Sequence, residues 1–394
     1  MLRLLTAGES HGRALVGIIE GVPSNLELTA DYINKQLHRR QQGYGRGGRM
    51  KIETDKVEIL TGVRHGRTLG SPISLVLWNR DFQNWGEKMS AEAIAKDIEK
   101  VVIPRPGHAD LVGKFKYAHG DIRNVIERSS ARETAMRVAL STIARRLLQE
   151  IGIRIGGHVF SIGSAGYKNR EDVDAIIRNL IAKKHGAEEI ADESDKSEVR
   201  CLDNGLADKM VQQIKRAKKL GDTLGGVVEA YVSGLPIGLG SYVEFDRKLD
   251  GQLAQAVMSV HAIKGVEIGE GFRNAAKFGS EVHDEILLKS KKIVRPTNRA
   301  GGLEGGVTNG QPLWVRAAMK PISTLMKPLK SVDLSEMKTV EARRERSDFC
   351  AVPAAGVVVE NVIAPVLANA VLEKFGGDSM DELGRRYDKE AFFG

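Results

Sequence analysis

The N-terminal stretch MLRLLTAGESHGRALVGIIEG, residues 1–21, decides between two folds, because residues 8–12 within it read G-x-S-x-G. This pattern is typical of the nucleophile elbow of serine hydrolases, in which a strand, a sharp turn and a helix expose the serine. Residues 2–6 are apolar enough for the strand, but the segment after the turn, ALVGIIEGVP, is rich in Val and Ile and ends in Gly-Val-Pro. Such a segment favours a second strand. We therefore expect a strand pair whose glycine-flanked turn presents Glu9, Ser10 and His11, and not a hydrolase elbow. A surface turn without chemistry is the alternative.

Beyond this pair, short β-like runs alternate with amphipathic helical segments along the whole chain. The spacing predicts strands at 72–78 and 153–163. It predicts helices at 90–100, 129–152 and 356–375, the last broken or kinked at Pro365. Another helix is expected at 29–42, with Thr29 as its N-cap. The acidic stretch 186–198 is interpreted as a surface excursion.

The alternation has no linker-like break, so residues 1–394 are expected to form a single domain. The segments GIIEGVP (17–23) and YVSGLP (231–236) resemble each other, and an internal duplication stays open beside coincidence.

Composition points to a soluble protein with anionic partners. Of the 394 residues, 42% are hydrophobic and 28% charged, as in ordinary globular proteins. No secretory leader pattern is present, which favours a cytoplasmic location without a membrane partner. Two cysteines do not make a disulfide framework, and Cys350 is interpreted as a small buried hydrophobe. The net charge of +8 suits nucleic acid or small anions, but aromatic residues are only 5% and no nucleic-acid-binding motif occurs.

The loop RRQQGYGRGGRM, residues 39–50, contains G-x-G-x-x-G at 43–48. A dinucleotide fingerprint needs a strand before these glycines and a helix after them, and here the order is reversed. What remains is a glycine loop with Arg40 and Arg46 that could close over an anion. A solvated basic loop is the alternative.

The segment ERSSARETAMR, residues 127–137, carries a second basic cluster. Ser130 and Glu133 have capping-box spacing, which predicts a helix that begins at 131 with Ser130 as its cap. A helix N-terminus flanked by Arg128 and Arg132 favours a phosphate site. A plain capped surface helix is the alternative.

The segment PRPGHAD, residues 104–110, holds Arg105 and His108 on a support stiffened by prolines. His108 alone could be a structural histidine. Like His11 it is adjacent to a glycine near a turn and beside an acid, and two such histidines can form an acid/base pair. No HExxH, CxxC or carboxylate cluster is present, so no metal is required.

Together these segments resemble the chorismate synthase family. The resemblance rests on TAGESHG, RRQQGYGRGGRM, GVRHGRTLGSPI, PRPGHADLVGKFKY, ERSSARET, GLGSYVEFDRKLD, GGLEGGVTNGQP, MKPISTLMKPL and RERSDFCAVPAAG. These occur in the family's order over almost the whole chain, except around 165–220. The resemblance implies an α+β fold, a β-α-β sandwich with helices between antiparallel sheets, assembled as a homotetramer.

The same resemblance implies a phosphate-eliminating lyase of the shikimate pathway. Its substrate is 5-enolpyruvylshikimate 3-phosphate, its products are chorismate and phosphate, and reduced FMN is needed although the reaction has no net redox change. By similarity, His11 protonates the departing phosphate, His108 acts near N1 of the flavin, and Asp348 assists proton removal through N5. Substrate binding is implied for Ser10, Arg40, Arg46, Arg105 and Arg132.

Contacts to FMN are implied for Arg128, Ser129, Ser130, His261, Ala262, Gly305, Lys320, Pro321, Ile322, Ser323, Thr324 and Arg346. Family members commonly have Asn in place of His261. NADPH as an electron source is implied at Arg40 and Arg46, with a separate flavin reductase as the alternative route.

Rival interpretations of the whole protein are a nucleic-acid-binding protein, a flavin oxidoreductase and a serine hydrolase.

Overall fold

The computed structural model describes residues 1–47, 54–345 and 347–387. Its first sheet starts with the N-terminal strand pair: β1 (Arg3–Ala7) runs antiparallel to β2 (Ala14–Glu20), and Leu5 lies opposite Ile18. Next to β2 lies β6 (Ile73–Trp78), and the two-residue strand β3 (Glu58–Ile59) completes the order β1-β2-β6-β3. The strand that follows the Ser10 turn confirms that the G-x-S-x-G pattern is not a strand–turn–helix elbow.

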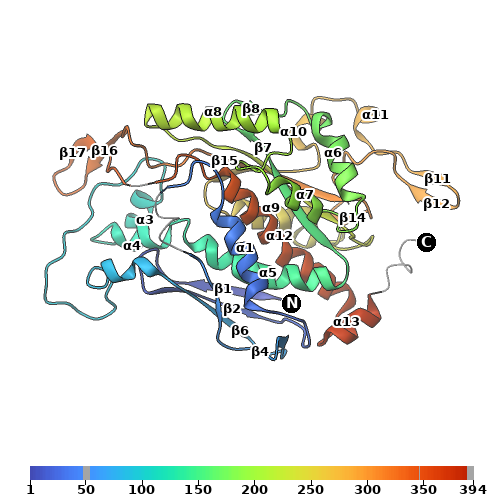
Figure 1. Ribbon diagram of the computed structural model, residues 1–394, viewed down its shortest axis with the longest axis horizontal. Helices are drawn as coiled ribbons and strands as arrows, with labels where there is room; N and C mark the ends of the chain where they lie inside the picture. Colours follow the sequence, from blue (N-terminus) through green and yellow to red (C-terminus); the bar gives the residue numbers. More distant parts are fainter. Residues whose placement is uncertain (48–53, 346, 388–394) are drawn as a thin grey trace.

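A second antiparallel sheet is built from later parts of the chain. Its order is β10-β15-β9-β7-β8, from β7 (Arg154–Ile162), β8 (Ala165–Gly166), β9 (Gly226–Ser233), β10 (Ile263–Ile268) and β15 (Leu313–Met319). In Figure 1 this sheet lies on the opposite side of the central helices from β1, β2 and β6. The mixed α+β class expected from the sequence is confirmed.

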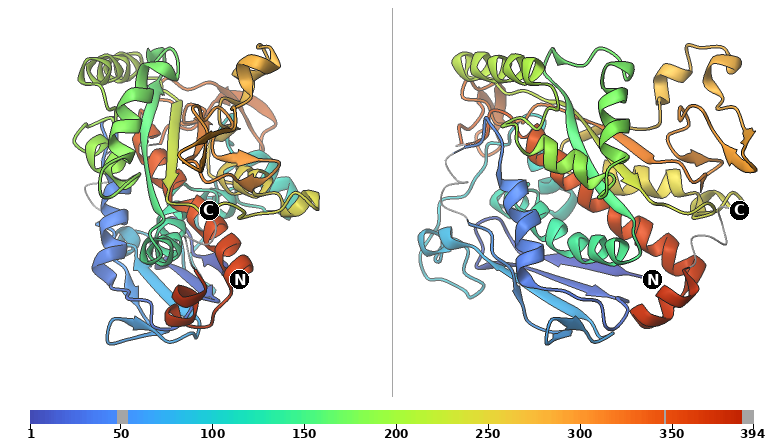
Figure 2. Two further views of the ribbon diagram at one scale, coloured as in Figure 1. Left: turned by 90° about the vertical axis from the view of Figure 1, so that its right-hand side faces the viewer. Right: turned by 45° about the vertical axis from the view of Figure 1, so that its right-hand side comes forward.

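Four helices pack against these sheets or against one another: α1 (Ala30–Gln41), α5 (Glu133–Glu150), α9 (Leu249–Met258) and α12 (Val352–Phe375). Helix α5 packs on β1, β2 and β6, α12 packs on β7 and β9, and α5 and α12 contact each other (Figures 1 and 2). The stripe expected to face the core of α5 is fully buried at Ala135, Val138, Ala139, Ile143 and Leu147. At the start of α1, the Thr29 hydroxyl accepts the Tyr32 N–H at 3.3 Å, as predicted for an N-cap.

Helix α12 is apolar on nearly all sides. It is long and apolar enough to span a membrane, but it is mostly buried in the protein, as the core helix of a soluble fold is. Pro365 lies inside this continuous helix, so of the break or kink expected there, the break does not occur. One buried carboxylate of α12, Glu360, contacts three buried guanidiniums, those of Arg39, Arg145 and Arg200.

Two other sequence expectations are wrong. Residues 90–100 form no helix and are mostly exposed, because the periodic alanines and isoleucines there contact no apolar surface in the described part of the chain. The acidic stretch 186–198 is not a surface excursion but contains α7 (Glu188–Ser194), which packs on β7 with Ile190 and Ala191 buried.

The remaining elements are short or peripheral. They are β4 (Val63–Arg64), β5 (Arg67–Thr68), η1 (Arg80–Asn84), α3 (Asp110–Tyr117), α4 (Arg123–Arg128), α6 (Glu171–Ile181), α8 (Asn204–Leu220), η2 (Phe245–Arg247), α10 (Gly271–Asn274), α11 (Gly279–Val282), β11 (Leu287–Lys289), β12 (Lys292–Val294), β13 (Leu303–Glu304), β14 (Val307–Thr308), β16 (Lys330–Asp333), β17 (Lys338–Glu341) and α13 (Met380–Arg386). Of these, α3, α4 and the β16–β17 hairpin lie together at one end of the molecule (Figure 1). The candidate site lies at this end.

Candidate active site

The turn between β1 and β2 is held against the end of α4. The Ser10 N–H donates to the Glu127 carbonyl at 3.0 Å, and the Ser10 hydroxyl donates to the Ser130 hydroxyl at 3.0 Å. The imidazole of His11 places Nδ1 3.0 Å from both carboxylate oxygens of Glu127 and stacks on Trp85, with ring centroids 4.0 Å apart. Both Ser10 and Glu127 are 2% exposed, so the turn presents His11 from a rigid support.

Behind this turn lies a buried cluster of two arginines and one carboxylate. Arg40, near the end of α1, lies 3.4 Å from Asp55 and donates to Thr134 at 3.0 Å. Arg132 pairs with the other oxygen of Asp55 and donates to Asn79 at 3.0 Å. Burial, together with Arg46 and Arg132, lowers the pKa of Arg40 to about 10 against the attraction of Asp55. Guanidiniums that destabilise each other in this way favour the binding of an anion.

A second ion pair lies close by. The guanidinium of Arg46 lies 2.9 Å from Asp348, and the other carboxylate oxygen of Asp348 accepts the Gly47 N–H at 2.6 Å. Both Arg46 and Asp348 act electrostatically on Arg40. The structure thus brings Arg40, Arg46, Arg132 and Asp348 into one neighbourhood although they come from distant parts of the sequence.

The segment 104–110 forms a second histidine–carboxylate pair. His108 Nδ1 lies 2.5 Å from Asp110, which is fully buried at the start of α3. Arg105 also contacts Asp110, at 2.8 Å, and its guanidinium reaches Thr324 at 3.4 Å. Burial raises the pKa of Asp110, but the hydrogen bonds from His108 and Arg105 outweigh it and hold the pKa far below its ordinary value. The carboxylate is therefore a permanent anchor for both side chains.

Residues 320–324 follow β15 and lie against this segment. The Lys320 ammonium donates to the Gly107 carbonyl at 2.5 Å, and its backbone N–H donates to the Ala262 carbonyl at 2.9 Å. His261 is within electrostatic range of His108 and Arg128, and its Nδ1 is 3.9 Å from Glu133. Arg128 donates to the Gly8 carbonyl at 3.1 Å and the Ser129 hydroxyl to the Val125 carbonyl at 2.7 Å. The structure therefore gathers residues 128–130, 261–262 and 320–324 around the two histidines.

One candidate residue stands apart from the others. Gly305 lies in the β13–β14 hairpin beside Tyr242, near the Leu313 end of β15, whereas Lys320 follows the opposite end. The length of that strand separates the two ends by about 20 Å. Within one chain, Gly305 is thus not brought together with the other candidate residues. Arg346 lies outside the described residues.

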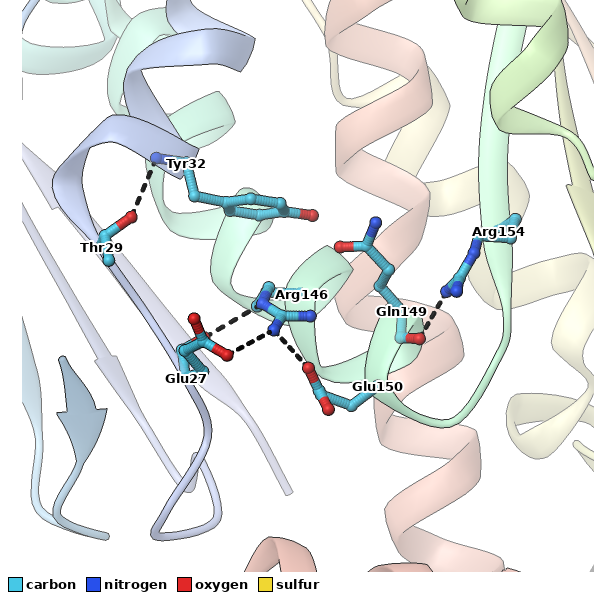
Figure 3. A pocket seen from close by; sticks show the side chains of 7 residues that line it. All are labelled: Glu27, Thr29, Tyr32, Arg146, Gln149, Glu150 and Arg154. Carbon is cyan, nitrogen blue, oxygen red and sulfur yellow. Dashed lines mark hydrogen bonds and ion pairs between the residues drawn. The ribbon is translucent and has the colours of Figure 1, made fainter. Parts of the chain in front are cut away.

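A separate cavity of about 530 Å³ lies between the start of α1 and the end of α5 (Figure 3). Its lining includes Tyr32, Arg146 and Arg154. Arg146 contacts Glu150 and Glu27, and Arg154 lies 3.6 Å from Glu188. Three carboxylates thus face two arginines here, whereas Arg40, Arg46 and Arg132 are paired with only Asp55 and Asp348, so this cavity is a poorer anion site than the cluster around Arg40.

Sequence reasoning missed the carboxylates and the aromatic ring that hold the site together: Asp55, Trp85, Asp110 and Glu127. Glu127 is part of the motif ERSSARET, and Asp110 is part of PRPGHAD. Their position inside these motifs was the only sequence signal that could have identified them. The capping-box prediction is wrong, because α5 begins at Glu133 with Arg132 as its N-cap residue. The Ser130 hydroxyl instead accepts hydrogen bonds from Ser10 and from the Arg132 N–H, at 3.0 and 3.3 Å.

Comparisons with known proteins agree with the resemblance noted in the sequence. The sequence model of the chorismate synthase family matches residues 2–372. The chain is 55% identical over 391 residues to the chorismate synthase of Chlorobium luteolum, covering 99% of this chain and 97% of that protein. It is 54% identical over 399 residues to that of Geobacillus kaustophilus, covering 99% and 100%. A crystal structure of chorismate synthase matches with a TM-score of 0.78 and 40% identity, covering 100% of this chain and 98% of the other.

Proposed function

This chain belongs to the chorismate synthase family, lyases of the shikimate pathway, and from that premise we propose how its residues carry the reaction. The single observation that carries the proposal is the convergence of buried arginines with two histidine–carboxylate pairs at one end of the helical layer. The reaction converts 5-enolpyruvylshikimate 3-phosphate into chorismate and phosphate by a 1,4-elimination. A substrate with one phosphate and two carboxylates needs several separate cationic contacts, which this convergence offers.

We assign the substrate to Ser10, Arg40, Arg46, Arg105 and Arg132. The guanidiniums of the four arginines are held at fixed positions by Asp55, Asp110 and Asp348, so little side-chain entropy is lost when the anion binds. The remaining positive charge of the cluster favours the phosphate, and the low exposure of Arg40 and Arg132, 4% and 6%, strengthens each contact.

Three residues are assigned to proton transfer. His11 donates a proton to the departing phosphate from a ring held by Glu127 and Trp85. His108, anchored on Asp110, governs protonation near N1 of the flavin. Asp348, held by Arg46 and the Gly47 N–H, assists removal of the ring proton. Ser10 shapes the phosphate end of the site and is not a nucleophile.

The donors around 320–324 fit reduced FMN. Gly107, whose carbonyl accepts from the Lys320 ammonium, has a φ of +75°, a backbone conformation that favours glycine. His261 Nδ1 is buried and has no hydrogen-bond partner within the described part of the chain, which leaves a polar atom for a ligand. We assign the cofactor to Arg128, Ser129, Ser130, His261, Ala262, Lys320, Pro321, Ile322, Ser323 and Thr324. The chemistry that bound reduced FMN would supply here is a transient donation of electron density to the substrate ring. Arg40 and Arg46 are proposed to contact NADPH where it serves as the reductant, and a separate flavin reductase is the alternative source of electrons.

We also propose the family's β-α-β sandwich as a single domain over residues 1–394, a homotetramer, and a cytoplasmic location. The outer face of the first sheet supports assembly, because Leu5, Ile18 and Trp78 are exposed there by 70%, 41% and 48%. A second copy would also provide a source for Gly305. Light scattering of the purified protein tests the tetramer, and a monomeric mass under assay conditions would contradict it.

Anaerobic turnover tests the function itself. The protein is mixed with 5-enolpyruvylshikimate 3-phosphate and photoreduced FMN, and released phosphate and chorismate absorbance are followed. We expect product far in excess of flavin, because the electrons return to it. Stoichiometric consumption of reductant would favour a flavin oxidoreductase instead. An aerobic assay with NADPH and oxidised FMN then distinguishes self-reduction from dependence on a separate reductase.

A further inference from the structure

The carboxylate of Glu127 makes three contacts with one residue. Both of its oxygens lie 3.0 Å from His11 Nδ1, and one accepts the His11 backbone N–H at 2.7 Å. The Glu127 side chain is 1% exposed, whereas that of His11 is 18% exposed. The imidazole is thus tied to a buried anion on one edge and remains accessible on another.

Two further side chains restrict this pair. Trp85 stacks on the His11 ring at an interplanar angle of 26°, which opposes rotation of the imidazole. Arg123 lies 3.3 Å from Glu127 and places its guanidinium 5.0 Å from the centre of the Trp85 ring. Burial raises the pKa of Glu127, but its hydrogen bonds and charge attraction to His11, together with Arg123, outweigh burial and lower that pKa. The acceptor is therefore ionised at neutral pH.

An ionised carboxylate only accepts hydrogen bonds, so the ring nitrogen facing it must carry a hydrogen. We propose that Glu127 is a positioning residue for His11, which keeps the proton on Nδ1 and leaves Nε2 as the atom that delivers a proton to the departing phosphate. This inference rests on the proposed role of His11 as the acid. In the step, the carbon–oxygen bond breaks and its electron pair leaves with the phosphate oxygen. The Nε2 proton of the imidazolium passes to the phosphate, and the neutral ring keeps its Nδ1–H on Glu127.

Glu127→Gln tests the proposal, with Glu127→Asp as the conservative variant and exposed Glu99→Gln as the matched control. General acid catalysis contributes about 10²–10⁴-fold, so mispositioning the acid should lower kcat by at least about tenfold. We expect KM and FMN affinity within about threefold of the unaltered protein, partial recovery in Glu127→Asp and no change in Glu99→Gln. A folded Glu127→Gln variant with kcat within twofold of the unaltered protein would overturn the proposal.

A spectroscopic measurement on the unaltered protein does not depend on a variant folding. The ¹⁵N resonances of the His11 ring, assigned by their loss in His11→Gln, should show a protonated Nδ1 in the neutral ring. In Glu127→Gln the amide can donate as well as accept, so the Nε2–H tautomer should become populated. An unprotonated Nδ1 in the unaltered protein would overturn the proposal. Full activity in His11→Gln would instead contradict the proposed role of His11 as the acid. The ¹⁵N spectrum would still test whether Glu127 keeps the proton on His11 Nδ1.

Discussion

Asp55→Asn removes the one carboxylate that Arg40 and Arg132 share, and its effect follows from the burial of all three side chains. Their exposed fractions are 6%, 4% and 6%, so both guanidiniums would stay buried with their anion gone. Removing one partner of a buried ion pair costs about 3–5 kcal/mol. The unfolding entropy of 394 residues is about 0.8 kcal/mol/K, so we expect the melting temperature to fall by about 4–6 °C. The exposed Asp208→Asn change should stay within about 0.5 kcal/mol of the unaltered protein.

Inorganic phosphate provides the second half of this test. If the cluster is an anion site, the variant gains an uncompensated positive charge there and should bind phosphate more tightly. Ligand at a hundred times its dissociation constant stabilises a folded protein by about 2.7 kcal/mol. Phosphate should therefore raise the melting temperature of Asp55→Asn more than that of the unaltered protein, with chloride at equal ionic strength as the control. Equal responses of both proteins, or a melting temperature of Asp55→Asn equal to that of Asp208→Asn, would refute the reasoning.

Three other variants probe separate parts of the account. Ser10→Ala should lower kcat by less than about tenfold, because a hydrogen bond contributes about 0.5–1.5 kcal/mol. Loss of a catalytic nucleophile lowers kcat by about 10⁶-fold, so a decrease of that size in steady-state kinetics would favour the hydrolase interpretation instead. Burial raises the pKa of Glu360, but Arg39, Arg200 and Arg145 outweigh burial and lower that pKa to about 2. Glu360→Gln should therefore destabilise the protein most above pH 4.5, and progressively less as the pH falls toward 2. Melting curves between pH 3 and 8 check this, and a pH-independent difference would count against it. Burial, reinforced by Arg137, lowers the pKa of His261, so the unfolded chain binds a proton at this histidine more readily than the folded chain does. The protein should therefore lose stability below pH 6.5, and His261→Asn should relieve that loss. A constant difference between the melting temperatures of the two proteins from pH 8 to 5.5 would contradict this.

The parts of the fold that the sequence predicts well are those with local signals. The Val- and Ile-rich run after the Ser10 turn, the Thr29 cap and the apolar stripe of α5 each depend on neighbours within a few residues, and each is confirmed. The wrong expectations have tertiary causes. Residues 90–100 have helical spacing but find no apolar surface to pack on among the described residues. The acidic stretch at 186–198 is held against the body of the protein because Asp195 pairs with Arg39 and Arg200.

The candidate site follows the same division. Its arginines and histidines stand in glycine- and proline-rich segments that can be recognised in the sequence. The carboxylates that orient them cannot be paired with them by spacing, because Glu127 is 116 residues from His11 and Asp55 is 77 residues from Arg132. The packing of the β1–β2 turn against α4 creates the first pair, and the approach of the segment before β3 to the start of α5 creates the second.

The most direct test of the central claim is a crystal structure of the protein with FMN and 5-enolpyruvylshikimate 3-phosphate bound. We predict the substrate phosphate beside His11 and within reach of Arg40, Arg46 and Arg132, with the flavin against residues 320–324 and 128–130. Substrate bound at the cavity around Tyr32 and Arg154, or a flavin distant from His108, would contradict the account.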